Sequence, residues 1–430
     1  MTVAARHEPA IGPAAGWTLA VLFLTNFLSV ADRALLGVVT EPVRQELALS
    51  DTQMSLANGL LFVGFNLVAG VFIARMVDRG NRKRILIWGV AAWSLATALT
   101  GFATDFYTLS LARIAVGIGE ATAFPVALSM IPDLYRAQRR AGAVAIFQIS
   151  TYVGIIGGTI VAGIFAAVLG WRNMFVICGA AGIGVIALLI LTVREPAREV
   201  LEGDDRPPLA FFADLLDGMR RILAQPGYIA LATGFGFSTA VVSTLGAWGP
   251  AFFQRVHGVP LAEVGLVIGP PVGLGGIAGM MFAGLLANRL AKRRGRQSDM
   301  LFIPMIALPL AVPVVAAFLY SPSLVASTVA VGGMNFLLSC AWAPCLALAL
   351  ALAASTDRAL ASTLMLVASG LLGGGLGPLV VGLVSDFATS GQDAAGLRLG
   401  MSFMIVVPAI SVILLIIAWR QADRVLASAR

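Results

Sequence analysis

Two ten-residue stretches decide the fold: ARMVDRGNRK at residues 74–83 and GLLANRLAKR at residues 284–293. Both fit the pattern small-x-x-x-[DN]-R-x-x-[RK]-[RK], and each closes the second long apolar run of its half of the chain. A basic turn between two apolar runs is typical of the cytoplasmic connection between membrane-spanning helices. We therefore interpret the two stretches as equivalent turns in a chain that contains one helical unit twice.

The composition indicates a membrane protein. Apolar residues make up 59% of the 430 residues and charged residues only 12%, whereas a soluble protein carries about 25% charged residues. The formal net charge is +7, but the basic residues lie in short clusters between apolar runs, which favours topology signals over a nucleic-acid surface. The cysteines and histidines lack metal-ligand spacing, so we expect no metal, no cofactor and no catalytic residues.

Twelve apolar runs are long enough to cross a bilayer, which takes about 20 residues. The first six predicted spans are 17–39, 53–76, 84–104, 107–130, 141–168 and 174–193, and the second six are 227–254, 262–287, 300–320, 322–354, 359–386 and 400–420. The run 322–354 is overlong and is expected to tilt or to extend beyond the bilayer. The predicted domains are an N-tail (1–16), an N-terminal bundle (17–193), a central loop (194–226), a C-terminal bundle (227–420) and a C-tail (421–430).

The distribution of Arg and Lys predicts the orientation. With both termini in the cytoplasm, 23 of the 29 basic residues lie inside, two lie within spans and four lie outside, namely Arg44, Arg172, Arg255 and Arg398. Cytoplasmic loops carry such an excess. We therefore expect a multi-pass protein of the bacterial inner membrane with both termini and the central loop in the cytoplasm.

The two halves also correspond at a constant shift of 219 residues. The matched pairs are Pro125 with Pro344, Arg139 with Arg358, Gly154 with Gly373, and Gly158 with Gly377. Internal repetition of six helices is typical of transporters whose halves rock around a central site. The predicted fold class is therefore an all-α integral membrane protein with two six-helix bundles.

Several short motifs, all of them in the first half, point to one family. They are ADR (31–33), LLFVGF (60–65), WS (93–94), RIAVGIGEA (113–121), Pro125 and GWRNMF (170–175). Together with the DRGNRK turn (78–83), the acidic central loop and the twelve spans, they make the chain resemble the major facilitator superfamily and, within it, the spinster-type lipid transporters. The resemblance is strongest over residues 17–194, and it implies the major facilitator fold and a transport function.

Four charged residues are predicted well inside spans: Asp32, Arg33, Arg113 and Glu120. The helical rise places Asp32 and Arg113 both roughly 10 Å below the same membrane surface, and Glu120 about two turns deeper on the face of Arg113. Because burial in a low-dielectric medium favours the neutral form of a carboxylic acid, we predict a proton-coupling site of Asp32, Arg113 and Glu120, in which Arg113 moves between the acids. The spinster resemblance implies the same roles. The alternative is a permanent Asp32–Arg113 bridge that only ties two helices together.

Arg33 points about 100° away from Asp32 on the helix. We expect it to bond carbonyls or lipid, or to reach the substrate cavity. Under the 219 shift, Glu120 corresponds to Ser339 and Arg113 to Gly332, so the second half has no equivalent charges. The facing cavity wall is expected to be apolar with a few uncharged polar side chains. The alternative for each of these side chains is ordinary helix packing. These candidates are Ser243, Thr244, Trp248, Asn335, Ser339 and Trp342.

A second charged cluster lies at the predicted cytoplasmic ends of the first-half helices. It consists of Asp78, Arg79, Arg82, Asp133 and Arg136. We predict that these residues form a cytoplasmic gate by bridging neighbouring helix ends. The alternative is that they only set topology and keep the loops solvated.

These features predict a proton-coupled secondary transporter that moves an amphiphilic, lysolipid- or sphingoid-like substrate by alternating access, as a monomer in the lipid bilayer. A charged wall facing an apolar wall suits a molecule with a polar head and a tail. Small organic anions or drugs are the alternative substrates, with Arg113 as the anion-binding residue. A non-transporting membrane receptor is disfavoured because embedded charges would serve no purpose there. The sequence contains no Walker motif and no paired nucleophile and base, which argues against ATP drive and against an enzyme.

Overall fold

A computed structural model of the chain describes residues 13–196, 208–294, 296–354, 357–389 and 394–428. Every secondary-structure element in these ranges is helical. The expectations for most of the N-tail and for the acidic part of the central loop fall on residues 1–12 and 197–207, which lie outside the described residues.

The first half contains α1 to α8 with one short π-helix, η1. The bounds are α1 (Pro13–Val38), α2 (Thr40–Glu46), α3 (Asp51–Ser55), η1 (Leu56–Leu60), α4 (Leu61–Arg79), α5 (Arg82–Thr100), α6 (Phe106–Glu120), α7 (Ala123–Leu134) and α8 (Ala137–Thr192). Within α8, Gly170 has a φ of 80° and a ψ of 154°. The helix breaks at this glycine because only glycine adopts such a conformation without strain, and α8 therefore forms two limbs.

The second half repeats this arrangement after a connecting helix. The bounds are α9 (Pro208–Leu223), α10 (Tyr228–His257), α11 (Leu261–Arg294), the 3₁₀-helix η2 (Gln297–Leu301), α12 (Phe302–Tyr320), α13 (Leu324–Ser339), α14 (Trp342–Leu352), α15 (Arg358–Ala368), the π-helix η3 (Ser369–Leu376), α16 (Gly377–Thr389), α17 (Ala394–Met401) and α18 (Phe403–Ser428). The connecting helix α9 was not predicted from the sequence, which indicated only a polar loop there.

The described residues contain ten helical segments that are long and apolar enough to cross a membrane. One of them, Gln138–Thr192, holds the two limbs of α8. The helix α5 begins with three charged residues, Arg82, Lys83 and Arg84, and completes the set. The predicted all-α membrane fold with two six-helix bundles is confirmed.

The internal repeat is visible in the positions of two helix breaks. The helix α6 ends at Glu120 and α7 begins at Ala123, while α13 ends at Ser339 and α14 begins at Trp342. Both pairs are related by the same shift of 219 residues. The predicted long span 322–354 corresponds to one membrane-crossing segment, Leu324–Leu352. The structure adds that this segment consists of two helices joined by a turn, like its counterpart in the first half.

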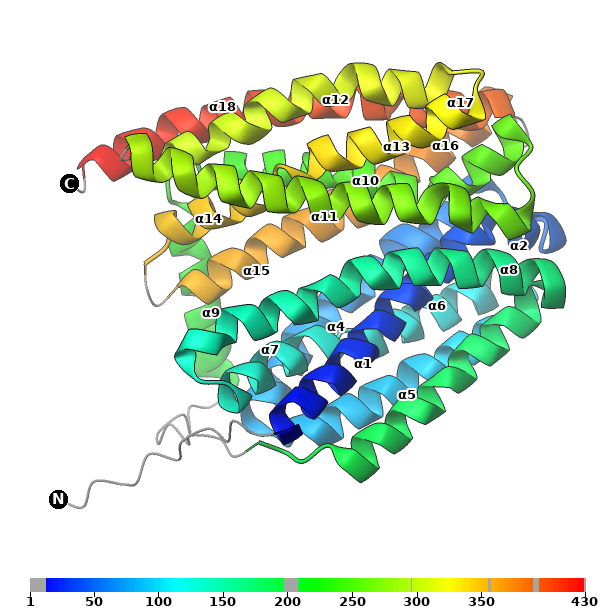
Figure 1. Cartoon of the computed structure of the whole chain (residues 1–430), viewed down its shortest axis with the longest axis horizontal. Coiled ribbons are helices and arrows are strands. Elements are labelled where there is room, and N and C mark those ends of the chain that lie inside the picture. The colour runs from blue at the N-terminus through cyan, green and yellow to red at the C-terminus, as the bar shows by residue number, and fades with distance from the viewer. Residues whose placement is uncertain (1–12, 197–207, 295, 355–356, 390–393, 429–430) are drawn as a thin grey trace.

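The two bundles share one hydrophobic core at a single end of the molecule. We call this the closed end; it contains α2 and the turn between the limbs of α8, and it lies at the right of Figure 1. A buried cluster there joins Val38 and Val43 of the first half to Phe252 and Phe318 of the second. The opposite, terminal end is where α1 begins and α18 ends. There the buried clusters of the two halves are separate, one around Met130 of the first half and the other around Met300 of the second half.

Two glycines show how closely the halves approach. A Cβ added to Gly265 of α11 would lie 2.1 Å from the carbonyl oxygen of Thr159 in α8, and one added to Gly382 of α16 would lie 2.5 Å from the carbonyl oxygen of Asp51. Larger residues at either site would push the backbones apart. Both contacts hold the first half against the second.

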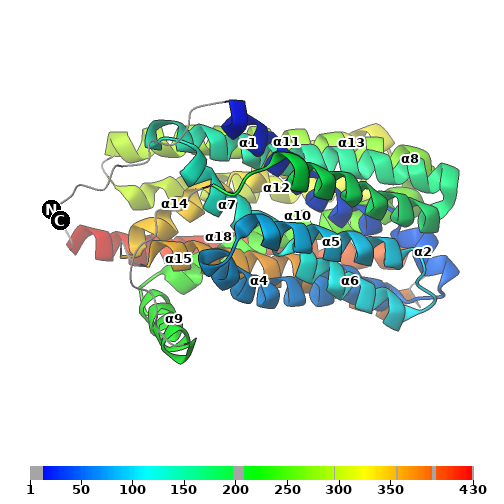
Figure 2. The ribbon, with the colours of Figure 1, turned by 90° about the horizontal axis from the view of Figure 1, so that it is seen from below.

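The helix α9 stands apart from the two bundles at the terminal end (Figure 2). It is anchored to the loop before α15, because Arg221 donates two hydrogen bonds of 3.0 Å to the carboxylate of Asp357. The paired guanidinium holds the pKa of the Asp357 carboxyl below its usual value. The central connection is therefore attached to the second bundle at a defined point.

Candidate transport site

Four charged side chains from two helices form a cluster inside the first bundle. Asp32 and Arg33 come from α1, and Arg113 and Glu120 come from α6. The nearest approach of Arg113 to Asp32 is 3.8 Å, between Nη1 and Oδ2, and these side chains are 1% and 7% exposed. Arg33 donates from Nε to Glu120 Oε2, and its side chain is 45% exposed while that of Glu120 is fully buried.

Neutral neighbours hold this cluster in place. Thr97 of α5 donates a hydrogen bond of 2.9 Å to Asp32 Oδ1. The ring of Phe62 in α4 contacts both guanidinium groups, with its centroid 5.6 Å from Arg33 Cζ and 5.0 Å from Arg113 Cζ. Each cation is attracted by the negative face of the ring. Four helices of the first bundle therefore contribute to one buried charged site.

The two acids of the cluster each keep one carboxylate oxygen without a hydrogen-bond partner in the described part of the chain. Among the described residues, no amide, hydroxyl or guanidinium donates to Asp32 Oδ2 or Glu120 Oε1. The site thus offers two unfilled acceptor atoms at which a proton can be held.

The structure changes one part of the predicted geometry. Of the alternatives for Arg33, the structure favours a place in the charged site, because Arg33 pairs with Glu120. A side chain as long as arginine reaches around the helix, so the 100° offset between neighbouring Cα–Cβ directions did not separate it from the acids. Asp32 and Arg113 lie level as predicted, but their contact is long and unsupported by a hydrogen bond, since Arg113 Nε and Nη1 have no acceptor among the described residues.

The predicted polar points of the second half lie in two environments. Trp248 is 1% exposed and donates from Nε1 to Ser55 Oγ at 3.2 Å, across the seam between the halves. It is therefore part of the closed end in this conformation, not of an open cavity wall. Thr244, Asn335 and Ser339 are buried among helices, whereas Ser243 and Trp342 are half-buried, and Trp342 makes an edge contact with Phe235 at 5.1 Å. Their contact with a substrate stays a prediction.

The predicted cytoplasmic gate is built around Arg82. This side chain is 1% exposed and pairs with Asp133 of α7 and, at 2.7 Å, with Glu195, which follows α8. Its Nη2 also donates to the carbonyl oxygen of Pro196 at 2.9 Å. Arg82 thus joins three segments of the first bundle. Asp78, Arg79 and Arg136 also have interaction partners, and the gating role of the five residues stays a prediction.

A buried charge network at the closed end was missed from the sequence. Arg255, at the end of α10, pairs with Glu41 at 2.6 Å and binds both carboxylate oxygens of Asp51 at 2.8 Å. Arg44 pairs with Glu41 at 2.8 Å. Glu41, Arg44 and Asp51 belong to the first half and Arg255 to the second, so this network fastens one bundle to the other. We call these four residues the closed-end network.

Further bonds extend the closed-end network to α16. Asp386 accepts hydrogen bonds from the backbone N–H groups of Asp51 and Thr52 at 3.1 and 2.8 Å, at the start of α3. Ser385 donates to Asp51 at 2.7 Å. Burial raises the pKa of Glu41, but hydrogen bonds and charge from Arg44 and Arg255 outweigh this and hold that pKa below its usual value.

The sequence contained a weak signal for the closed-end network. Arg44 and Arg255 were assigned to external loops as scattered positive charges, yet they lie near Glu41 and Asp51 at matching helix ends. Opposite charges at the same ends of spans from different halves would have indicated a bridge. Their burial could not be predicted, because it depends on how the two bundles tilt toward each other.

The motif GWRNMF (170–175) explains how the limbs of α8 are joined. After the break at Gly170, Arg172 donates to the carbonyl oxygens of Gly101 and Ala103 at 3.0 and 2.7 Å and to Glu46 at 2.8 Å. Its guanidinium lies 4.3 Å from the ring centroid of Trp171. These contacts all lie within the first half, so Arg172 stabilises the bundle and not the seam.

Comparisons with known proteins agree with this architecture. Residues 22–378 match the family profile described as Major Facilitator Superfamily. The chain is 30% identical over 422 residues to a protein of Mycolicibacterium smegmatis described as an MFS-type efflux pump, covering 97% of this chain and 95% of that one. It is 28% identical to protein spinster homolog 1 of Xenopus laevis, covering 87% of this chain and 74% of that one. Among solved structures, a bacterial homolog of the human lysosomal transporter spinster, in an inward-facing and unoccupied conformation, superposes with a TM-score of 0.84 at 27% identity, covering 96% of this chain and 98% of that one.

Proposed function

Because the chain belongs to the Major Facilitator Superfamily and is spinster-like, we propose that it is a proton-coupled secondary transporter that moves an amphiphilic, lysolipid- or sphingoid-like substrate by alternating access. Its fold and family are those of a multi-pass membrane transporter. The coupling ion and the substrate class are the parts that we propose.

The cluster of Asp32, Arg33, Arg113 and Glu120 carries the proposal for proton coupling. Charges embedded in a membrane-spanning bundle are costly, and each residue costs roughly 2.5–3.5 kcal/mol on insertion scales. In the described structure, Asp32 and Glu120 each have an unpartnered carboxylate oxygen at which a proton can be held, and the long Asp32–Arg113 contact leaves Arg113 free to move between them. Adding or removing a proton therefore changes the charge at the point where α1 meets α6.

The shape of the molecule supports alternating access. The halves are fastened at the closed end by the closed-end network and by a shared core, while their buried clusters are separate at the terminal end. If the terminal end is cytoplasmic, this is an inward-facing state, as in the spinster homolog that superposes on it. Opening the closed end would then expose the charged cluster to the other side.

Uptake into proteoliposomes under a pH gradient tests the proposal, with a labelled lysophospholipid as the substrate. Glu120→Gln fixes the neutral form of the side chain, so it should abolish gradient-driven accumulation while equilibrium binding is retained. Glu263→Gln is the matched control, because Glu263 is an exposed acid in the first turn of α11, and it should transport like the parent protein. Normal pH dependence in Glu120→Gln would remove Glu120 from the mechanism.

Small organic anions or drugs are the alternative substrates, and one observation favours them. The relative that is 30% identical over nearly the whole chain is described as an efflux pump. Arg113 has two nitrogens without an acceptor in the described structure, which would suit an anionic group. A panel of lysolipids, organic anions and hydrophobic drugs in the same liposome assay separates the two proposals.

A further inference from the structure

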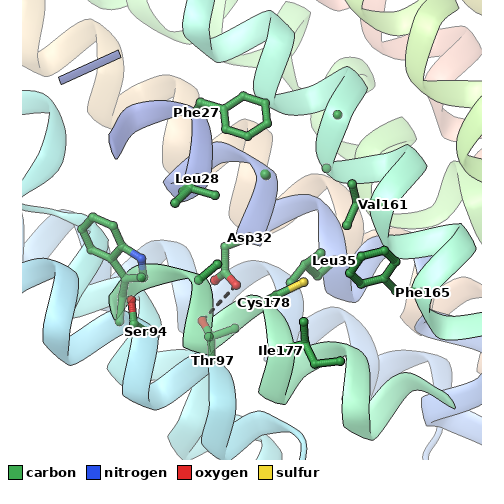
Figure 3. Close-up of a pocket in the computed structure, with 17 residues that line it drawn as sticks. Phe27, Leu28, Asp32, Leu35, Ser94, Thr97, Val161, Phe165, Ile177 and Cys178 are labelled. Atoms are coloured by element: carbon green, nitrogen blue, oxygen red, sulfur yellow. Dashed lines mark hydrogen bonds between the residues drawn. The ribbon is translucent and has the colours of Figure 1, made fainter. Parts of the chain in front are cut away.

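A cavity of about 160 Å³ lies inside the first bundle, between α1, α5 and the two limbs of α8 (Figure 3). We call it the lateral pocket. All the described residues that line it belong to the first half, so it is separate from the space between the bundles where the proposed transport site would receive substrate. The lateral pocket shares one residue, Asp32, with the proposed coupling site.

The mouth of the lateral pocket faces the membrane. Val161 and Ile177, on the two limbs of α8, line the pocket and are 36% and 42% exposed. Both lie within membrane-spanning limbs of α8, so the surface that they expose is covered by lipid. Phe27, Leu35 and Phe165 make most of the remaining wall apolar (Figure 3). A molecule entering here would arrive from the bilayer and would be mostly apolar.

The inner end of the lateral pocket carries one charge. Among the described residues that line it, Asp32 is the one with a charged side chain. Thr97 occupies Oδ1 of this carboxylate, as Figure 3 shows, and Oδ2 receives no hydrogen bond from an amide, hydroxyl or guanidinium. Asp32 is only 6% exposed. A buried acceptor at the bottom of an apolar pocket favours a ligand with a donor at one end.

The charge balance around Asp32 favours a cationic head. Within the cluster, Glu120 is paired with Arg33, whereas Asp32 has only the 3.8 Å contact with Arg113. A cation delivered through the lateral pocket would be attracted by the weakly paired carboxylate of Asp32, whereas an anion would be repelled.

We propose that the lateral pocket binds a single-chain primary alkylammonium from the membrane, with the ammonium group at Asp32 and the chain between the limbs of α8. The site itself does not depend on the proposed function. Its consequence for transport does, because a bound ammonium would compete with Arg113 and with the proton for Asp32. An alkylammonium is therefore expected to inhibit transport without entering the space between the bundles.

Photolabelling of the full-length protein in nanodiscs tests binding without any transport measurement. The probe is an alkylamine with a diazirine near the end of its chain, and labelled peptides are mapped by mass spectrometry. We expect labelling of the α1 and α8 segments that line the pocket, competed by n-octylamine and not by n-octanoate or n-octanol. Equal competition by octanol would show that only apolar filling matters and would overturn the proposal.

Two tryptophan variants on the same limb of α8 provide a matched comparison. Val161→Trp fills the mouth and should reduce specific labelling by about tenfold or more, which corresponds to about 1.4 kcal/mol. Val168→Trp adds the same side chain at a position that is 76% exposed and does not line the pocket, and it should label like the parent protein. Equal labelling in both variants would show adsorption from the bilayer and would exclude the site.

A transport assay then tests whether n-octylamine inhibits transport by binding in the lateral pocket. Val161→Trp should transport lysophospholipid like the parent protein but should lose inhibition by n-octylamine. Inhibition that survives in this variant would exclude the lateral pocket as its cause. If no variant transports lysophospholipid, the photolabelling result still decides whether the site exists, and only the proposed function fails.

Discussion

Asp32 connects three features of the molecule at the scale of a single residue. Its Oδ1 is bonded to Thr97, its Oδ2 is near Arg113, and its side chain lines the lateral pocket. The contact with Arg113 is long enough to be broken without loss of a hydrogen bond. A residue with several weak partners can exchange them during a cycle, whereas a tight bidentate pair would fix one state.

The Asp32–Arg113 pair should be energetically coupled although it is long. Asp32→Asn leaves Arg113 as a buried cation near fewer acids, and Arg113→Ala leaves Asp32 without its nearest base, so each single change should destabilise the protein. The double variant removes both charges and should lose less stability than the two singles together, with a coupling free energy of about 0.5–3 kcal/mol. Thermal unfolding in detergent measures all four proteins. Strict additivity would mean that the pair does not interact in the folded protein.

At the scale of helices, the sequence indicated where spans and turns lie but not how helices touch. Hydropathy and the 219 shift predicted the spans, because both depend only on local composition and spacing. The breaks between α6 and α7 and between α13 and α14 were both missed, because the apolar run continues through each of them. The charged candidates were found because an embedded charge stands out in an apolar run, whereas their pairing depended on rotamers that no pattern encodes.

The closed-end network should control whether that end opens. Arg255→Gln removes the cation that bridges Glu41 and Asp51 between the halves. Breaking a buried pair costs about 3–5 kcal/mol. Reversing a 1:99 equilibrium between the open and closed conformations takes roughly 5.5 kcal/mol, so loss of this pair should remove most of the preference for the closed conformation. Spin labels at Tyr107 and Leu399, which are exposed and lie in different halves, should move apart in this variant. Arg172→Gln is the control, since Arg172 binds only within the first half, and an equal change there would contradict the assignment.

The pH dependence of closure can be predicted from Glu41. Its pKa lies below the ordinary value of 4.5 because bonds from Arg44 and Arg255 outweigh the effect of burial. An acid whose pKa is lowered in the folded protein stabilises its contact at every pH above its ordinary pKa. This stabilisation is lost as the pH falls through the lowered pKa. The contribution of Glu41 should thus be constant from about pH 5.5 to about pH 8. In Glu120→Gln, the distance between the two labels should not change over this range, and a change would place a proton switch within the closed-end network.

At the scale of the whole molecule, the two halves have the same architecture but differ in their embedded charges. The repeat gives both halves the same helix breaks, but the counterpart of Glu120 is Ser339 and that of Arg113 is Gly332. The first half therefore contains the embedded charged cluster, and the second half provides Arg255 to the closed-end network. The sequence predicted the asymmetry in embedded charges. It could not predict which end is closed, because both conformations of a rocking transporter are compatible with one set of spans.

The orientation of the molecule is the last prediction, and it decides what the closed end faces. Most basic residues lie at the terminal end, and cytoplasmic loops carry such an excess. Thr104, between α5 and α6, and Ala224, between α9 and α10, are exposed at opposite ends. In a Cys178→Ser background, chosen because the other two cysteines are buried, an impermeant thiol reagent added to intact cells should label Thr104→Cys and not Ala224→Cys. The reverse pattern would place the closed end in the cytoplasm and make this conformation outward-facing.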